Sequence, residues 1–318
     1  MCHMYIKDFV FGATVYDCYI LQDFRVGTTR NATKYLDVTL RDNSGTISAK
    51  LWDCCESIGV KDVGGIVLIE GSVGQYQEHL QITLTQIKSV NTNEVESLGC
   101  DISALVPVAP IDVDDAILYL DWIIYSIEDE HYKAVCQEML NRHCEELKYY
   151  PAAKSVHHSF LSGLLMHTTN MLYLAEYIAK LYDEEINHDL LLAGVLLHDF
   201  GKVKEFTISE LGLVTDYSTV GQLMGHSTIC AEEIAEVGEL LDVPEDKVLL
   251  LKHLILSHHG QPDFGAAVKP MCIEAELLSC IDMIDSRVEI YAEATAPLSA
   301  GEFTPKIYAL DKRVFKHR

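Results

Sequence analysis

The hydrophobic residues of this 318-residue chain change their spacing near residue 100, and this change limits the folds that are available to it. From residue 5 to about residue 90, apolar residues alternate with polar ones, as in half-buried strands. Between residues 112 and 290 they recur every three to four residues, as along helices that bury one face. About five short strands in the first third are typical of a small barrel. The chain should therefore be multidomain, with an N-terminal all-β barrel followed by an all-α domain.

The segment V-P-V-A-P lies between the two patterns and is typical of a linker. The predicted organisation is a barrel domain over residues 1–95, a linker over 96–111, a helical domain over 112–290 and a C-terminal extension over 291–318. Hydrophobic residues make up 49% and charged residues 23%, which favours a folded globular protein over a disordered or fibrous one.

Composition also excludes several classes of protein. The longest apolar run, residues 190–197, is far shorter than the roughly 18 residues that span a bilayer, and no secretory signal precedes the barrel. The 10 cysteines form no C-x-x-C motif, so we expect reduced thiols in a cytoplasmic protein that has no membrane partner. A net charge of -24 argues against nucleic-acid binding through bulk charge. Residues 1–100 carry 8 basic and 12 acidic residues, the least acidic part of the chain.

One outer face of the predicted barrel carries aromatic and basic side chains. Alternation in the hairpin YLDVTL-RDNSG-TISAKLWD points its apolar residues inward and leaves Tyr35, Arg41, Lys50 and Trp52 outside, with Tyr76 in the next strand connection. Bases stack on aromatic rings while cations meet phosphates, so this face suits a single-stranded nucleic acid. The alternative is an aromatic pair, Tyr35 with Trp52, that merely seals a sheet edge.

Nine of the 14 histidines lie from His157 to His259, in segments whose other residues have the pattern typical of buried helices. In AGVLLHDFGK an apolar run ends in His198 and Asp199, and a buried carboxylate needs a partner. A metal ion would be that partner, since imidazole with carboxylate suits Mn, Fe or Zn better than Ca. The candidate ligands are His167, His198, Asp199, His226, His258, His259 and Asp282.

These seven residues are enough for two divalent ions if Asp199 bridges them. One ion would take His167, His198 and Asp282, and the other would take His226, His258 and His259. Two such ions can stabilise both the attacking and the leaving oxygen of an in-line phosphoryl displacement. The set therefore predicts hydrolysis of a phosphate ester, although any single histidine on an apolar helix is more often a hydrogen-bonded core residue.

The motifs HHSFLSGLLMHT, LLHDFGK, GHS, LSHHGQPDFG and ALDKRVF, in this order behind a strand-rich segment, resemble the YhaM family of 3'-to-5' exoribonucleases within the HD phosphohydrolase superfamily. The resemblance covers nearly the whole chain. It implies an OB-fold joined to an HD domain, and Mn²⁺-dependent removal of 5'-mononucleotides from the 3' end of single-stranded RNA. It also implies a catalytic role for Asp199. Lys202 would have a catalytic role by contacting a substrate phosphate. His157 and His158 would contact the substrate phosphate or the leaving group.

Several alternatives stay open at this point. Fe²⁺ or another divalent metal is an alternative to Mn²⁺, DNA is an alternative to RNA, and the chain could form a homo-oligomer. Lys202 could instead neutralise a helix end or pair with Glu205. The HD site alone would also permit a phosphohydrolase of a small nucleotide or cyclic dinucleotide with a regulatory barrel, or a binding module with an inactive catalytic domain. The basic tail FTPKIYALDKRVFKHR could dock on the catalytic domain, dock on another subunit or stay solvated.

Overall fold

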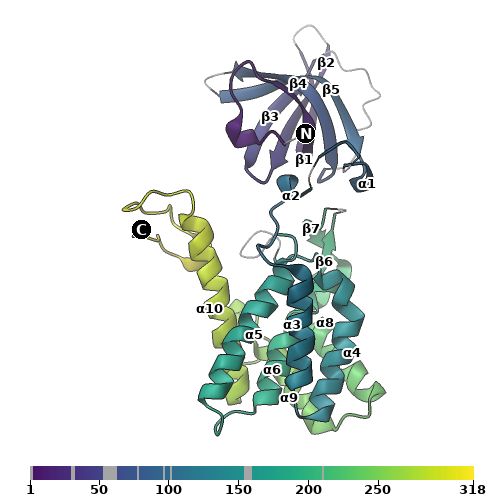
Figure 1. Cartoon of the computed structure of the whole chain (residues 1–318), viewed down its shortest axis with the longest axis vertical. Coiled ribbons are helices and arrows are strands. Elements are labelled where there is room, and N and C mark those ends of the chain that lie inside the picture. The colour runs from purple at the N-terminus through teal and green to yellow at the C-terminus, as the bar shows by residue number, and fades with distance from the viewer. Residues whose placement is uncertain are drawn as a thin grey trace. The chain divides into compact units, whose positions relative to one another are not determined.

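A computed structural model of the chain describes residues 3–29, 33–52, 63–76, 79–95, 97–100, 102–153, 160–209 and 211–318. It divides into two compact units (Figure 1). The first comprises Met1–Val108 with Ile208–Thr215, and the second comprises Ala109–Thr207 with Asp216–Arg318. The predicted fold class, a β-barrel followed by a helical domain, is confirmed.

The first unit is a closed five-stranded barrel. Its strands are β1 (Thr14–Thr28), β2 (Lys34–Asp42), β3 (Gly45–Leu51), β4 (Ile66–Tyr76) and β5 (His79–Val90). They pair in the order β1-β2-β3-β5-β4, with β3 and β5 parallel and the other pairs antiparallel. This order is that of the OB-fold, a five-stranded Greek-key barrel. Leu36, Val38 and Leu40 are buried inside it, as the alternation predicts.

A buried ion-pair cluster joins the start of the chain to the barrel. His3 Nδ1 lies 3.0 Å from Asp17 Oδ2 on β1, and His3 Nε2 lies 3.3 Å from Asp42 Oδ2 at the end of β2. Burial disfavours the charged imidazole, but hydrogen bonds and charges of the two carboxylates outweigh it and raise the pKa of His3 to about 9. The cluster therefore favours the protonated form of His3 and gains an ionic contribution from it.

We expect the contribution of His3 to barrel stability to disappear at alkaline pH. Because the folded-state pKa is raised above the ordinary value of 6.5, the contribution is complete below pH 6.5 and is lost as the pH rises through about 9. Denaturant unfolding of a Trp122→Phe background, in which Trp52 is the only tryptophan, would report on the barrel. The loss of unfolding free energy on His3→Gln should be larger at pH 6 than at pH 10, and exposed His79→Gln is the control. Equal losses at the two pH values would contradict this assignment.

The segment predicted as a linker is partly structured. Short helix α1 (Thr92–Val95) ends just before it, short helix α2 (Ile102–Leu105) lies within it, and the first unit continues to Val108. Ala104 and Val106 are buried, and the Ala104 carbonyl accepts a hydrogen bond from the amide of Asn43 at 3.0 Å. This stretch therefore packs with the barrel.

The second unit is built from helices. They are α3 (Val113–Ser126), α4 (Glu130–Leu147), α5 (Gly163–Leu181), α6 (His188–Leu197), α7 (Lys202–Glu205), α8 (Thr219–Leu240), α9 (Glu245–Ser257) and α10 (Ile273–Thr295). Polar side chains cap several of them at the N-terminus: Asp112, Asp129, Asn187 and Ser218 each accept a backbone N–H of the first turn. Such caps stabilise a helix by about 1 kcal/mol. They explain why the helices begin at these residues.

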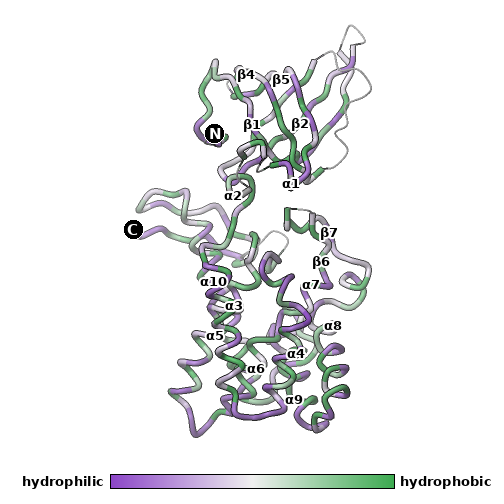
Figure 2. The backbone as a smooth tube through the Cα atoms, turned by 45° about the vertical axis from the view of Figure 1, so that its right-hand side comes forward, coloured by the Kyte–Doolittle hydropathy of each residue, from purple (hydrophilic) through white to green (hydrophobic). Residues whose placement is uncertain are grey.

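Helix α6 is the centre of the helical core. All eight residues from Leu190 to Leu197 are buried, and α3, α4, α5, α9 and α10 pack around them. The α6 tube is predominantly green in Figure 2 because its sequence is almost wholly apolar. The hydrophobic effect thus fixes the end of α6, where His198 and Asp199 follow, deep inside the domain.

Two other features complete the fold. A short hairpin of β6 (Phe206–Ile208) and β7 (Val214–Tyr217) interrupts the helices, which the helical spacing did not predict. The C-terminal extension forms a hairpin with short 3-10 helix η3 (Tyr308–Leu310) at its tip. None of the described helices combines the length and apolar character that a membrane span requires.

Candidate metal centre

The seven predicted ligands lie together in the helical unit, although they come from five separate parts of the chain. His167 lies on α5, His198 and Asp199 follow α6, and His226 lies on α8. His258 and His259 follow α9, and Asp282 lies on α10. Their nitrogen and oxygen atoms form two groups, each within 4.8 Å: His167 with His198 and Asp282, and His226 with His258 and His259. These are the two groups that the sequence predicted.

Asp199 lies between the two groups and directs one carboxylate oxygen at each. Its Oδ2 is 3.2 Å from His198 Nε2 and 3.6 Å from His167 Nε2. Its Oδ1 is 3.4 Å from His226 Nε2 and 3.8 Å from His258 Nε2. Each carboxylate oxygen of Asp199 therefore faces one of the two groups.

The donor set fits divalent metal. Asp199 Oδ1 and His258 Nε2 are buried, and neither has a hydrogen-bond partner among the described residues. A buried polar atom without a partner costs about 1–3 kcal/mol. Coordination to a cation would satisfy both atoms. Imidazole nitrogens with carboxylate oxygens also match the preferences of Mn, Fe and Zn.

Hydrogen bonds on the far side of the imidazole rings fix how four of the histidines are oriented. His198 Nδ1 donates to the carbonyl of Val195 at 2.8 Å, and His258 Nδ1 donates to that of Ile255 at 2.6 Å. His167 Nδ1 contacts Asp285 Oδ2 at 2.7 Å. In each case Nε2 is left to face the cluster. Metal-ligating histidines almost always have such an outer partner, which sets the tautomer and the ring orientation.

The fourth outer partner is Glu205, and it depends on a glycine. Gly225 has φ +71° and interrupts α8, a conformation that glycine adopts readily. The helix restarts at His226, whose amide donates to Glu205 Oε1 at 3.0 Å and whose Nδ1 contacts the same oxygen at 3.1 Å. Glu205 therefore caps the restarted helix and orients the imidazole.

Three of the clustered histidines have clearly shifted pKa values, in opposite directions. Burial, together with neighbouring imidazoles, lowers the pKa of His259 to about 4 and that of His258 well below its ordinary value. These rings are therefore neutral, as ligands must be. Burial also disfavours charge on His167, but the hydrogen bonds that its ring nitrogens donate to the carboxylates of Asp282 and Asp285 raise its pKa to about 9. Despite burial, Lys202 and His198 hold the pKa of Asp199 well below its usual range.

Lys202 lies directly beside the cluster. Its Nζ donates to Asp199 Oδ2 at 2.6 Å, and the side chain is almost completely buried. A turn separates α6 from α7, and at Gly201 an added Cβ would lie 2.1 Å from the His226 carbonyl oxygen. The glycine of HDFGK thus lets this turn approach α8 closely. The remaining predicted catalytic residues, His157 and His158, lie outside the described residues.

On the barrel, the structure brings together four of the five residues predicted to bind nucleic acid. Lys50 Nζ lies 5.5 Å from the ring centroid of Tyr35, 5.8 Å from that of Trp52 and 5.8 Å from that of Tyr76. The Tyr35 and Trp52 rings are 5.0 Å apart. We call these four residues the aromatic–cation face. Arg41 has the same strand parity as Tyr35 but lies six residues along β2, about 20 Å away.

The sequence analysis missed Asp285 as a positioning residue for His167. Asp285 is 8% exposed, and its second oxygen accepts a hydrogen bond from Asn170 Nδ2 at 3.1 Å. It lies one helical turn after Asp282 in the motif CIDMID, so both carboxylates lie on the same face of α10. That spacing was the available signal.

We expect Asp285→Asn to weaken metal binding by about 10- to 100-fold, the usual cost of losing an outer partner of a ligating histidine. Calorimetric titration of the metal-free protein with Mn²⁺ would measure the change. Glu293→Gln alters an exposed carboxylate on the same helix and is the matched control. An unchanged affinity in Asp285→Asn would show that His167 needs no orienting carboxylate.

Comparison with known proteins places this cluster in a known domain. The family model for the HD domain matches residues 164–287, a range that contains all seven clustered residues. The chain therefore carries an HD domain, the domain of a superfamily of metal-dependent hydrolases.

Two solved structures are similar to part of the chain. One is the second OB-fold domain of replication protein A from Methanococcus maripaludis, with 21% identity over 27% of this chain and 93% of that chain and a TM-score of 0.24. The other is a replication protein A heterotrimer bound to ssDNA, with 20% identity over 28% of this chain and 69% of that chain and a TM-score of 0.22.

Proposed function

We propose that this protein is a metal-dependent 3'-to-5' exoribonuclease that hydrolyses single-stranded RNA to 5'-mononucleotides. The observation that carries the proposal is the position of Asp199, whose two oxygens face two groups of imidazoles inside an HD domain. The aromatic–cation face of the barrel supports a single strand as the substrate, because stacking tolerates any base. The 3'-to-5' direction and the choice of Mn²⁺ are supported by the resemblance of nearly the whole chain to the YhaM family.

Two divalent cations, when bound, would activate a water molecule for attack and supply positive charge for the scissile phosphate. His167, His198 and Asp282 would hold one ion, and His226, His258 and His259 would hold the other. Asp199 would serve both, and the outer partners Asp285 and Glu205 would hold two of the imidazoles in place. The local positive charge matters because a chain of net charge -24 otherwise repels RNA.

Lys202 has a second role in this proposal. Its ammonium group keeps the Asp199 carboxylate ionised, and its place at the edge of the cluster suits contact with a substrate phosphate. His157 and His158 remain candidates for contact with the phosphate or the leaving group.

A time course on 5'-labelled single-stranded RNA with Mn²⁺ tests the proposed function. The expected result is a ladder that shortens from the 3' end, with 5'-mononucleotides as products, and a matched DNA strand compares the two nucleic acids. RNA whose 3' end is blocked by a bulky group is the control and should survive. If metal-loaded protein leaves RNA intact but hydrolyses free nucleotides or cyclic dinucleotides, the protein is instead a small-nucleotide phosphohydrolase. RNA binding without hydrolysis of any of these esters would indicate a binding module.

A further inference from the structure

A cavity of about 340 Å³ lies directly beside the metal-ligand cluster. His258, His259 and Asp282 form part of its lining, so a molecule bound in the cavity would reach the cluster. Binding sites for small molecules commonly enclose about 300–1,000 Å³. The cavity therefore has room for a single nucleotide and little more.

The other lining residues match the parts of a nucleotide. Phe264 is 74% exposed and offers a ring face on which a base can stack, and Ile290 adds apolar surface. The exposed guanidinium of Arg287 has no ion pair within the described part of the chain and can donate two hydrogen bonds to a phosphate. Glu276 is the acidic lining residue outside the cluster, and it would repel a phosphate placed near it.

One side of the cavity is formed by the C-terminal extension. Ala309 and Leu310, in η3 at the hairpin tip, belong to the lining. The HD match ends at residue 287, so this wall lies outside the family domain. Along α10, Asp282 and Ile290 are separated by about 12 Å, so the cavity extends from the metal cluster towards this wall.

The hairpin is held firmly in place. Lys316 Nζ donates to the carbonyls of Thr295 at 2.9 Å, Ala296 at 3.4 Å and Leu298 at 2.6 Å, which satisfies the C-terminal end of α10. Within the hairpin, Thr304 and Val314 are buried and hydrogen-bonded to each other. The yellow segment at the end of α10 in Figure 1 is therefore a hairpin attached to the end of that helix.

We propose that the C-terminal hairpin is the end wall of the substrate cavity: it admits one terminal nucleotide and blocks a strand that continues past the metal centre. The hairpin therefore selects strand ends over internal phosphodiesters. This inference rests on the proposed function. It names the C-terminal hairpin as the part of the chain that restricts cleavage to strand ends.

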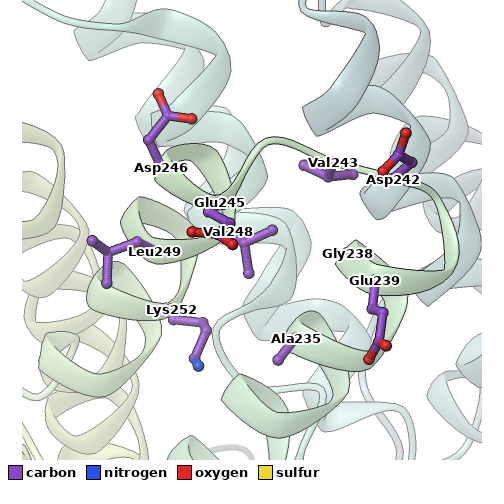
Figure 3. Close-up of a pocket in the computed structure, with 10 residues that line it drawn as sticks. All are labelled: Ala235, Gly238, Glu239, Asp242, Val243, Glu245, Asp246, Val248, Leu249 and Lys252. Atoms are coloured by element: carbon purple, nitrogen blue, oxygen red, sulfur yellow. The ribbon is translucent and has the colours of Figure 1, made fainter.

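A second cavity supplies a matched control. It lies at the turn between α8 and α9, and Figure 3 shows Glu239, Asp242, Leu249 and Lys252 among its lining residues. Gly238 lies about 18 Å along α8 from His226, and Leu249 lies about 14 Å along α9 from His258, so these lining residues do not contact the metal centre. Leu249 is 67% exposed, and a charge placed there should affect neither substrate binding nor hydrolysis.

The first experiment places a carboxylate in the wall. Leu310→Glu should raise KM for a short RNA with a free 3' end by about 10-fold or more, a typical effect of one altered pocket contact. It should raise Kd for adenosine 5'-monophosphate, measured by calorimetry, by a similar factor. Leu249→Glu should change neither value. The smaller diester methyl p-nitrophenyl phosphate, which has neither a base nor a sugar to reach the wall, should be hydrolysed equally by all three proteins. Equal nucleotide affinity in the wild type and Leu310→Glu would overturn the proposal, whether or not RNA is a substrate.

The second experiment opens the wall. Lys316→Ala removes the attachment of the hairpin to α10, and Leu310→Gly removes the side chain that lines the cavity. Wild-type protein should leave covalently closed circular RNA intact while degrading the linear form, and both variants should gain cleavage of the circle. If both variants bind metal normally, degrade linear RNA and still spare the circle, the wall does not select ends. Failure of the wild type on linear RNA would instead contradict the proposed function.

Discussion

Asp199→Asn is expected to lower the rate of RNA hydrolysis by at least about 10³-fold while the fold is retained. Loss of an outer partner costs about 10- to 100-fold, and Asp199 is closer to the chemistry than any outer partner. Its carboxylate also faces both groups of imidazoles, with Oδ2 3.2 Å from His198 Nε2 and Oδ1 3.4 Å from His226 Nε2. The amide keeps the shape of the side chain and loses the negative charge that would hold the proposed cations.

Two readouts separate a loss of metal from a loss of structure. Metal retained after dialysis, measured by mass spectrometry, should fall in Asp199→Asn, and the circular dichroism spectrum should not change. Glu239→Gln, which alters an exposed carboxylate at the remote α8–α9 cavity of Figure 3, should behave as wild type in every assay. Full activity in Asp199→Asn would exclude the cluster as the site of hydrolysis.

The second large effect concerns the barrel. Replacing Tyr35 and Trp52 together with alanine should weaken binding of a long single strand by about 10- to 100-fold, because stacking contributes about 1–3 kcal/mol per base. Hydrolysis of a dinucleotide should be unaffected, since so short a substrate needs only the metal centre. The two results together would assign binding of long strands to the barrel and hydrolysis to the HD domain.

Fluorescence anisotropy with a labelled RNA would give the affinities. Tyr16→Ala removes a barrel tyrosine that is 53% exposed and does not belong to the aromatic–cation face, so it should leave the affinity unchanged. An affinity within about twofold of wild type in the Tyr35 and Trp52 double variant would indicate that the ring pair only seals the sheet edge.

Much of the fold could be predicted because it follows from local patterns. The alternation of Leu36, Val38 and Leu40 was sufficient for β2, and the uninterrupted apolar run before His198 was sufficient to place that motif in the helical core. The seven clustered residues could be selected because imidazoles and carboxylates are rarely buried without a reason.

The spacing of Asp282 and Asp285 could have revealed one outer partner, but Glu205 and the C-terminal wall could not be predicted from such patterns. Glu205 orients His226 only because Gly225 interrupts α8, and nothing in the spacing of the two residues reveals that contact. The wall residue Leu310 lies within an unremarkable basic tail, and its position depends on Lys316 reaching the end of α10. Both features depend on contacts between distant parts of the chain, whereas periodicity reports only on neighbours in sequence.

The order of the two units along the chain has a consequence for synthesis. All five barrel strands lie between Thr14 and Val90, whereas the clustered residues of the metal centre extend from His167 to Asp282. Domains generally fold as units while the ribosome is still elongating the chain. A nascent chain that stalls after the barrel would therefore carry the aromatic–cation face without the metal centre. Under the proposed function, such a fragment would compete with the full-length protein for RNA and leave it uncut, so prematurely terminated chains would inhibit their own full-length product.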